Sequence, residues 1–498
     1  MTHKIFFLTI FSKLWSVLIN LIFIPLYVDI LGVESFGLIT FYSTLSTSLS
    51  ILDVGFSTAV TREIAIFESN SKIKIDRNNL IQSVEIIYWV FAFTVGIVLL
   101  LSSDFIAREW LNTVTVDIDT ISNCIKYMSI VLVFQFPISL YNGILIGISK
   151  QNQVALLSIL YMTLKNAGVF LIIYFSNKDI ELYFLLQAAV MFFTVFLFKR
   201  VIKSFIEPNL EFRFSLSHIN KIWKFITGMT GISLITFFLT QIDKLIVSKT
   251  VSLENVGYYN LAFTVSGIIS QGVVVIQSFL FPKFTELYTK LKLNELMTLY
   301  YKSCNWVSII IFPISLQLIF YAKEILLFWT GNEILTHKTS LLVQVVTMGA
   351  TFNALMWVPY FYLLSRGITK FTFYQNIIIA LISVPLIIFL SNKYGILGAG
   401  VVWLFVNICY VLFSIPLIHY LYIHSGTKKW FLESIIIPFF YSLVVFVPFK
   451  YLQIHFFQSI GFIQFLILLV TSGIAYIIIV PQLRFYFLNR KIWNQIHW

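Results

Sequence analysis

The chain is dominated by apolar runs that are too long to be core elements of a water-soluble domain. The first covers residues 6–31, and several later runs are of similar length. A helix needs about 20 apolar residues to cross a bilayer, whereas a transmembrane β-strand needs about 10 and alternates with polar residues. Charged residues make up only 11% of the chain, against about 25% in soluble proteins. The sequence therefore predicts an all-α polytopic protein embedded in a lipid bilayer.

Fourteen transmembrane helices are predicted from these runs and from the turn and charge signals between them. Of the 34 Lys and Arg residues, 23 fall in loops on one side, seven in loops on the other side and four within spans. Basic loops stay in the cytoplasm, so we expect both termini to be cytoplasmic. The net charge of +12 then belongs to these loops and does not indicate nucleic acid as a partner. The spans centre near residues 20, 48, 91, 134, 163, 191, 236, 268, 311, 348, 380, 407, 441 and 470.

Short segments recur along the chain at one offset. The sequence at 34–37 (ESFG) returns at 254–257 (ENVG), and 147–150 (GISK) returns at 367–370 (GITK), so both pairs share an offset of 220 positions. A third match, 171–178 with 386–393, lies close to the same offset. These matches indicate a duplicated unit of six spans. Because six is even, the two copies have the same orientation and are related by a pseudo-twofold axis along the membrane normal.

The duplication predicts four parts. Residues 1–198 form an N-terminal six-helix lobe, 199–222 a cytoplasmic linker, 223–420 a C-terminal six-helix lobe, and 421–498 two additional transmembrane helices with a cytoplasmic C-terminus. Two lobes facing each other favour a central cavity that opens alternately to each side, as in transporters with parallel repeats. A duplicated bundle with a purely structural role is the alternative.

Ionisable residues inside predicted spans are the strongest candidates for function, because each costs roughly 2.5–3.5 kcal/mol to insert near the bilayer centre. Lys165 lies near the middle of the fifth span, with Tyr161 on the same helical face. Lys13 in the first span and Asp53 in the second have similar depths, so an ion pair between them is predicted. We expect these residues to line a cavity.

Other in-span charges lie nearer the interface. Lys126, Asp243 and Lys244 can reach the membrane surface by extending their side chains, which is the alternative to a cavity role. Ser46, Ser50, Asp53 and Ser57 form one stripe on the second span. Small hydroxylated residues also let helices pack closely, so this stripe can be packing rather than cavity lining.

The excess of in-span lysines predicts an anionic cargo, with phosphate or pyrophosphate as the group that carries such charge in cells. The chain contains no GxxxxGK[ST], HExxH or GxSxG motif, and of the longer outer loops 102–119 contains no histidine and 321–339 contains only His337. Its three cysteines are far apart and have no metal-ligand spacing. We therefore expect a non-enzymatic protein with no metal and no cofactor.

Two pairs of segments resemble the signature of a known family. The first pair is 25–38 (PLYVDILGVESFGL) with 52–65 (LDVGFSTAVTREIA), and the second is 241–248 (QIDKLIVS) with 254–262 (ENVGYYNLA). They are similar to the polysaccharide transporter family of the multidrug/oligosaccharidyl-lipid/polysaccharide exporter superfamily. Its Wzx-type members are oligosaccharide-lipid flippases that serve O-antigen and capsule assembly. The resemblance covers essentially the whole chain in span number and duplication.

The resemblance implies a bacterial inner-membrane flippase. It implies that undecaprenyl-pyrophosphate-linked repeat units move from the cytoplasmic to the periplasmic leaflet through a cavity between two six-helix lobes. A proton or sodium gradient would drive transport, and a polysaccharide polymerase and a chain-length regulator would be partners. Asp53, Arg62, Asp243 and Lys244 match the family motifs, whereas Lys165, Lys13 and Lys126 are candidates for head-group binding from membrane depth alone.

Three alternatives stay open at this point. A multidrug extruder of the same superfamily binds organic cations, which the lysines disfavour. The same fold can carry another lipid-linked glycan such as teichuronic acid. A membrane polymerase or ligase of the same glycan pathway is the alternative from a different class.

Overall fold

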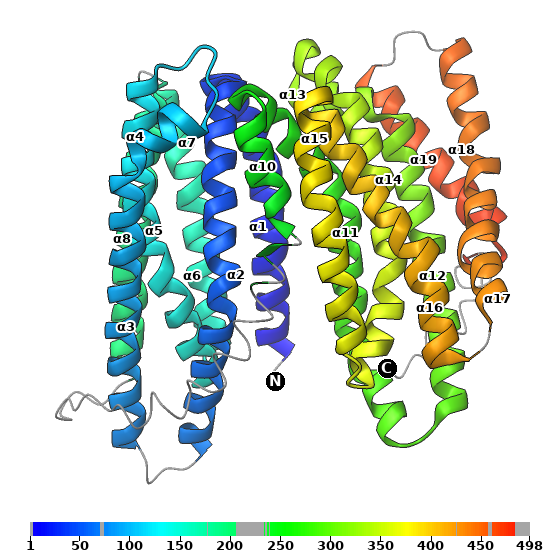
Figure 1. Cartoon of the computed structure of the whole chain (residues 1–498), viewed down its shortest axis with the longest axis horizontal. Helices are drawn as coiled ribbons and strands as arrows, with labels where there is room; N and C mark the ends of the chain where they lie inside the picture. Colours follow the sequence, from blue (N-terminus) through cyan, green and yellow to red (C-terminus); the bar gives the residue numbers. More distant parts are fainter. Residues whose placement is uncertain are drawn as a thin grey trace. The chain divides into compact units, whose positions relative to one another are not determined.

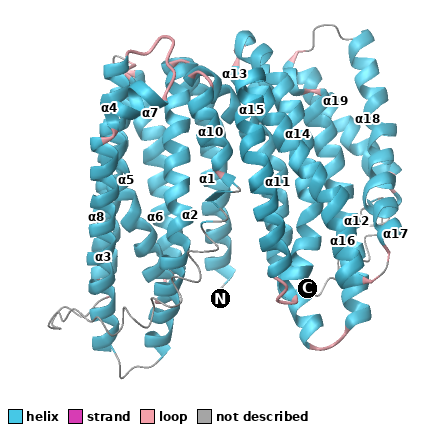
Figure 2. Cartoon of the chain, viewed as in Figure 1, coloured by secondary structure: helices cyan, strands magenta, loops and turns pink. Residues whose placement is uncertain are grey.

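The computed structural model of the chain describes residues 3–69, 74–176, 178–205, 234, 237–238, 240–424, 426–456 and 461–483 (Figure 1). Nearly all of them are helical (Figure 2). The described part contains no β-strand, and its single β-bridge joins Asn112 to Ser252. The prediction of an all-α fold is therefore confirmed. The chain divides into two compact units, Met1–Gly257 and Tyr258–Trp498, which are described separately.

Among the described residues, ten helices are long and apolar enough to cross a membrane, or eleven if the bent helix α2 (Val33–Ser69) is counted. One of the ten, Lys370–Ile423, has 54 residues. At about 1.5 Å per residue it is roughly 80 Å long, more than twice the ~30 Å hydrocarbon core. Its backbone leaves helical geometry at Gly395, where φ is 60°. The protein is thus a multi-pass membrane protein, and the count of fourteen spans stays a prediction.

The first unit is a helical bundle with α5 at its centre. α5 packs against α2, α3 and α8, and 56% of its most apolar window is buried, against 22% for α3. Val60, Tyr88 and Leu140 belong to the shared core. The unit consists of α1 (His3–Leu31), α2, α3 (Lys74–Leu101), α4 (Ser103–Phe105), the π-helical η2 (Ile106–Trp110), α5 (Ile118–Gly147), α6 (Gln151–Thr163), the π-helical η3 (Leu164–Gly168), α7 (Val169–Tyr174), α8 (Ile180–Lys203) and α10 (Ile242–Thr250).

Helix bounds repeat at the offset found in the sequence. α2 and α11 (Leu253–Thr289) each have 37 residues. Their first residues are 220 positions apart in the sequence, and so are their last residues. The repeated segments at their N-termini also touch. A Cβ added to Gly37 would lie 1.9 Å from the Leu253 carbonyl oxygen, and one added to Gly257 would lie 2.8 Å from that of Val33. The two contacts are reciprocal, because Val33 and Leu253 occupy the same position in the two copies.

The second repeated pair ends a helix in both copies, with a shift of two residues. α5 ends at Gly147, and the positive φ that reverses the chain falls on Ser149 (59°). α14 (Glu333–Ser365) ends earlier in its copy, and the positive φ falls on Gly367 (73°). The matched segments therefore stop equivalent helices through different turns.

The second unit is built around α14, which packs against α12, α13 and α15. α18 and α19 join this unit through α12, where Ile309 and Leu316 meet Phe446 and Tyr476. The unit consists of α11 from Tyr258 onward, α12 (Leu293–Phe320), α13 (Ala322–Thr330), α14, α15 (Lys370–Cys409), η4 (Tyr410–Ser414), α16 (Ile415–Ile418), η5 (His419–Ile423), α17 (Thr427–Phe431), η6 (Leu432–Ile436), α18 (Ile437–Phe456) and α19 (Phe462–Ile479).

The predicted domain boundaries stay predictions. α8 continues to Lys203, so the first residues assigned to the linker 199–222 are helical. The rest of that linker, from residue 206, lies outside the described residues. The two additional helices of 421–498 correspond in position to α18 and α19.

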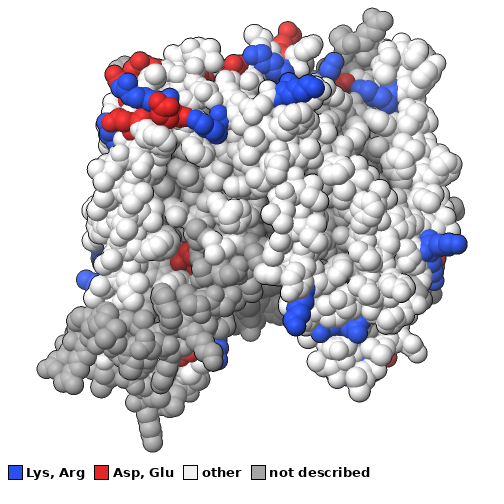
Figure 3. All heavy atoms as spheres, in the orientation of Figure 1, with Lys and Arg blue, Asp and Glu red and all other residues white. Residues whose placement is uncertain are grey.

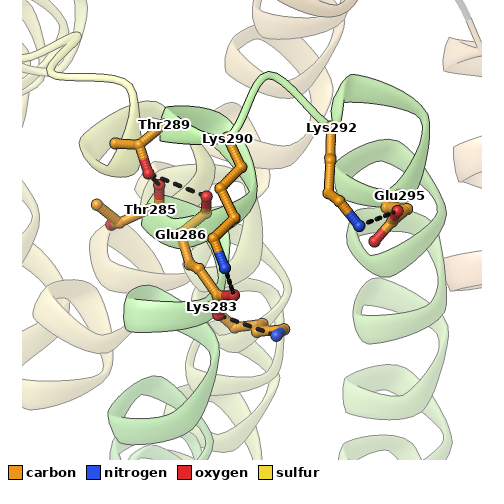
Figure 4. Close-up of polar contacts among 7 residues, drawn as sticks. All are labelled: Lys283, Thr285, Glu286, Thr289, Lys290, Lys292 and Glu295. Atoms are coloured by element: carbon orange, nitrogen blue, oxygen red, sulfur yellow. Dashed lines mark hydrogen bonds and ion pairs between the residues drawn. The ribbon is translucent and has the colours of Figure 1, made fainter.

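Charged side chains on the face drawn in Figure 3 gather toward the ends of the helices, and the band between them is almost free of charge. The turn between α11 and α12 shows how such an end is built (Figure 4). Glu286 pairs with Lys283 at 2.9 Å and with Lys290 at 2.8 Å, and Lys292 pairs with Glu295 at 2.7 Å. All these side chains are exposed to solvent, so this turn suits a loop outside the bilayer.

Candidate functional site

Lys165 lies in the interior of the first unit, inside the π-helical segment η3. It follows the start of α6 by fourteen residues, which places it about 21 Å along a helix of roughly 36 Å. Its ammonium nitrogen is 5.9 Å from the centre of the Tyr42 ring and 5.8 Å from that of Tyr161. The side chain is partly buried, and no carboxylate pairs with it among the described residues. Single π-helical turns inside α-helices are frequent at functional sites.

A hydrogen-bonded network connects this lysine to α5. The Tyr42 hydroxyl donates to Gln135 Oε1 at 2.9 Å, and Gln135 Nε2 donates to Ser46 Oγ at 2.5 Å. On the other side, Gln187 of α8 donates to the Lys165 carbonyl at 3.1 Å. Tyr161 was predicted to lie beside Lys165, whereas Gln135 and Gln187 were not predicted from the sequence. Both are amides inside apolar runs, so their cost of insertion in the bilayer is the signal that marks them, as it marks the in-span charges.

Asp53 lies between two straight parts of α2, Val33–Ile51 and Phe56–Phe67, which are inclined at 43°. Only 3% of its surface is exposed. Neither carboxylate oxygen has a hydrogen-bond partner among the described residues, although the hydroxyls of Ser139 and Tyr88 lie nearby. The carboxylate lines a pocket of about 20 Å³ between α2 and α5.

Lys13 does not pair with Asp53. Its side chain is exposed on α1, while the Asp53 oxygens are buried without a partner in the described structure. The predicted ion pair is therefore wrong for this conformation. Equal depth along neighbouring helices was not sufficient, because the two side chains leave their helices in different directions.

The hydroxyl stripe of α2 packs against α5. Ser57 Oγ donates to the Ser139 carbonyl at 3.2 Å, and Thr61 Oγ1 donates to the Gly143 carbonyl at 3.1 Å. A Cβ on Gly143 would meet Thr61 Oγ1 at 2.9 Å. Ser57, at the C-terminal end of the stripe, thus serves helix packing together with Thr61 one turn further on. Ser46 and Ser50, at its N-terminal end, face the polar network and the pocket.

Lys126 lies near the opposite end of α5 from the turn at Gly147, among polar residues. Its ammonium donates to Asn123 Oδ1 at 3.4 Å. Close by, Ser122 donates to Asp104 at 2.5 Å. This hydrogen bond lowers the pKa of Asp104, and the charges of Lys126 and Arg108 lower it further. Lys126 therefore belongs to a polar helix end, and the structure does not bring it to Lys165.

The remaining candidates lie apart from Lys165 as well. Arg62 is exposed and pairs with its neighbour Glu63 at 3.2 Å. Asp243 and Lys244 lie in the first turn of α10, where Lys244 contacts Gln241 Oε1 at 3.5 Å. The structure thus places Asp53 between α2 and α5, connects Lys165 to these helices only through the Tyr42 ring and its hydrogen bond to Gln135, and leaves the other candidates at separate positions.

The segment 110–115 crosses one end of the first unit and was not predicted from the sequence. The Glu34 carboxylate accepts hydrogen bonds from the backbone of Val114 at 2.6 Å and Thr115 at 2.7 Å. Leu253 N donates to the Asn112 carbonyl at 2.7 Å. Glu34 is buried, so the first residue of the repeated ESFG segment anchors this segment.

The second unit contains a partly buried polar cluster that was not predicted from the sequence. Asn353 donates to Asn407 Oδ1 at 2.8 Å, and Trp357 donates to Asn353 Oδ1 at 3.1 Å. Asn407 is buried, as Gln187 is in the first unit. Each unit therefore contains a buried amide within an apolar helix.

Comparison with known proteins identifies relatives by sequence. A family model described as polysaccharide biosynthesis protein matches residues 3–288. A candidate O-antigen transporter of Shigella flexneri is 25% identical over 385 residues, which cover 75% of this chain and 87% of the relative.

Solved structures share the fold. The lipid II flippase MurJ in an inward closed conformation superimposes with a TM-score of 0.73 at 16% identity, over 98% of this chain and 100% of MurJ. An inward-facing multidrug transporter of the MATE family, in the MOP superfamily, gives 0.66 at 15% identity, over 83% of this chain and 96% of that one. The fold is therefore that of MOP-superfamily transporters.

Proposed function

The chain belongs to the polysaccharide biosynthesis protein family, and on this premise we propose that it is a flippase for lipid-linked oligosaccharides. Its cargo is an O-antigen or capsule repeat unit on undecaprenyl pyrophosphate, which it moves from the cytoplasmic to the periplasmic leaflet of the inner membrane. The O-antigen transporter relative and the flippase fold of MurJ support this assignment. A polymerase and a chain-length regulator would act on the delivered units.

Lys165 is the observation that carries the proposal. Its ammonium lies inside the first unit, beside two tyrosine rings and without a carboxylate partner among the described residues. An unpaired in-span lysine costs roughly 2.5–3.5 kcal/mol. An anionic oxygen about 4 Å away would return about 4 kcal/mol at an effective dielectric constant near 20. A pyrophosphate head group is thus the kind of ligand that makes this lysine favourable.

The surroundings of Lys165 suit a mobile ligand better than a fixed partner. Tyrosine rings stabilise an ammonium only by roughly 0.5–2 kcal/mol, so they hold Lys165 in place without neutralising it. Gln187 donates to the backbone carbonyl of Lys165, and Gln135 accepts from the hydroxyl of the adjacent Tyr42. Alternating access would expose this group first to the cytoplasm and then to the periplasm.

The rival functions make different demands on the same residues. A multidrug antiporter shares the fold but binds organic cations, which a free ammonium at the site repels. A polymerase or ligase would need acid and base groups beside its substrate, whereas Lys165 is surrounded by tyrosines and amides. We therefore place the protein among transporters and not among enzymes.

A deletion strain complemented with Lys165 variants tests the proposal. Without the protein, cells should complete the lipid-linked repeat unit and retain it in the inner leaflet. Lys165→Arg should restore surface glycan in part, because it keeps the positive charge, whereas Lys165→Ala and Lys165→Met should restore roughly a tenth or less. Surface glycan is measured together with membrane abundance of each variant and with the accumulated lipid-linked intermediate by mass spectrometry.

Lys292→Ala is the matched control, since Lys292 is exposed and pairs with the exposed Glu295 at the α11–α12 turn. It should support transport at the wild-type level. Wild-type transport by Lys165→Met would reject a ligand-contacting role for Lys165. Unfinished repeat units in the deletion strain would reject the flippase assignment itself.

A further inference from the structure

The π-helical turn η3 interrupts a span that is α-helical on both sides, in α6 and in α7. A π-turn pairs a carbonyl with the N–H five residues further on, where an α-turn uses the fourth. Closing η3 to an α-turn would rotate α6 and α7 against each other by about 100°, the angle that one α-helical residue covers. Lys165 lies inside this turn, so the form of the turn decides where its side chain is directed.

Three backbone carbonyls in or beside this turn accept hydrogen bonds from side chains. Gln187 of α8 donates to the Lys165 carbonyl at 3.1 Å. The Tyr27 hydroxyl of α1 donates to the Asn166 carbonyl at 2.8 Å, and the Asn166 amide donates to the Met162 carbonyl at 3.0 Å. The carbonyls of a continuous α-helix are satisfied by its own backbone. These side-chain donors therefore support the backbone where the regular ladder is disturbed.

The Tyr27 hydroxyl lies where a backbone hydrogen bond would be in an α-helix. There, the Phe170 N–H would donate to the Asn166 carbonyl. In this structure the Tyr27 hydroxyl donates to that carbonyl and also faces the Phe170 N–H. A side chain that enters the ladder in this way distorts a helix locally. The Tyr27 ring makes edge-on contacts with Phe170 and Tyr183, with centroids 5.8 Å and 5.2 Å apart, and these contacts hold the hydroxyl at the turn.

The donors to this turn are buried, whereas the Lys165 ammonium is directed elsewhere. Tyr27 is 5% exposed and Gln187 is 1% exposed, so a carbonyl that lost either donor would be left unsatisfied away from water, which is unfavourable. The Lys165 ammonium lies beside the Tyr42 and Tyr161 rings. Main chain and side chain of Lys165 are thus held by different groups.

We propose that Tyr27 and Gln187 are positioning residues, which hold η3 in its π-helical form and thereby direct the Lys165 ammonium to the Tyr42 and Tyr161 rings. Both act on the main chain at or next to Lys165, so neither has to contact the cargo. Their effect on head-group binding rests on the proposed function. Their effect on the direction of Lys165 does not depend on it.

The position of the Lys165 ammonium can be measured without any cargo. Reductive methylation with ¹³C-formaldehyde converts the lysines of the purified full-length protein to dimethyl-lysines, which keep their charge. The NMR signal of Lys165 is the one that is missing in Lys165→Arg. Because ring currents shield nuclei above an aromatic ring, this signal should lie upfield of those of exposed lysines such as Lys292. Tyr27→Phe and Gln187→Met should move it toward the signals of the exposed lysines.

Tyr174→Phe is the matched control for Tyr27→Phe, since it removes a hydroxyl from a tyrosine that is 53% exposed at the end of α7. It should leave the Lys165 signal at its wild-type position. An unchanged signal in both Tyr27→Phe and Gln187→Met would overturn the proposal, and so would a wild-type Lys165 signal among those of the exposed lysines. If Tyr27→Phe does not fold, Gln187→Met decides on its own.

A double-mutant cycle separates a positioning role from a general structural role. The Kd of farnesyl pyrophosphate, which carries the head group on a short isoprenoid chain, is measured with the protein in lipid nanodiscs. Tyr27→Phe should raise it roughly 3- to 10-fold, as expected for the loss of one buried hydrogen bond. In the Lys165→Met background Tyr27→Phe should have no further effect.

The cycle also distinguishes failure of this proposal from failure of the proposed function. An equal increase of the Kd in the Lys165→Met background would show that Tyr27 acts independently of Lys165, which would overturn its positioning role. If Lys165→Met binds the probe as wild type does, the head-group role of Lys165 fails instead. The NMR signal then still decides whether Tyr27 and Gln187 direct the lysine.

Discussion

Gly37→Ala should destabilise the protein although alanine is the better helix former. Gly37 lies in the first turns of α2, where a Cβ would sit 1.9 Å from the Leu253 carbonyl oxygen and 2.8 Å from its carbonyl carbon. These atoms are backbone, so no side-chain rotation can relieve the clash. The two helices must separate if the methyl group is to fit.

The size of the effect follows from that distance. Ordinary contact begins at 3.4 Å, so the backbone of Leu253 has to move away until the separation grows from 1.9 Å to that value. Leu253 is also held by its hydrogen bond to Asn112 at 2.7 Å. Overpacking of this kind costs about 1–3 kcal/mol or more, which exceeds the roughly 0.5–1 kcal/mol that alanine gains over glycine inside a helix. We expect a net loss of about 1–2 kcal/mol and a melting midpoint lowered by roughly 1–2 °C, because an unfolding entropy of about 2 cal/mol/K per residue amounts to about 1 kcal/mol/K for 498 residues.

The assay is heating of the detergent-solubilised full-length protein followed by fluorescence-detected size exclusion. Gly267→Ala is the matched control, because Gly267 lies in α11 with no atom within 4 Å of an added Cβ. That variant should melt at or above the wild-type midpoint. The reasoning is refuted if Gly37→Ala melts as high as Gly267→Ala.

Two further predictions concern topology and the second unit. In a background with Cys124, Cys304 and Cys409 replaced, Val114→Cys should react with an impermeant maleimide in intact cells, while Leu291→Cys should react only after permeabilisation. The wild-type side chains at these two positions are 69% and 80% exposed. Labelling of both from the same side would contradict the orientation. Glu324 accepts from Lys450 at 3.2 Å and from Gln453 at 2.5 Å, so Glu324→Ala should cost roughly 1–3 kcal/mol of stability by leaving both donors unsatisfied. Glu324→Gln keeps an acceptor for Gln453 and should lose less, and equal melting of the two variants would contradict this account.

The sequence identified Lys165 and Asp53 but not what surrounds them. In-span charge is visible in one dimension, because its cost depends only on depth in the bilayer. Which side chains meet depends on the direction in which each leaves its helix and on how the helices are rotated against one another. That is why Lys13 and Asp53 have similar depths but do not pair, and why Gln135 was not recognised as the link between Tyr42 and the Asp53 pocket.

By itself, the sequence determined the helical membrane class and the duplication, since apolar length and a fixed offset between matching segments are properties of the chain alone. Equal bounds of α2 and α11 at that offset followed from the same repeat. Only the tertiary structure decided that Gly37 and Gly257 lie at reciprocal close contacts. It also decided that the N-terminal part of the α2 stripe faces a polar pocket while its C-terminal part packs on α5, and that the Asp53 oxygens have no hydrogen-bond partner among the described residues. These features depend on distances of a few ångströms between helices far apart in sequence, and hydrophobic periodicity carries no information about such distances.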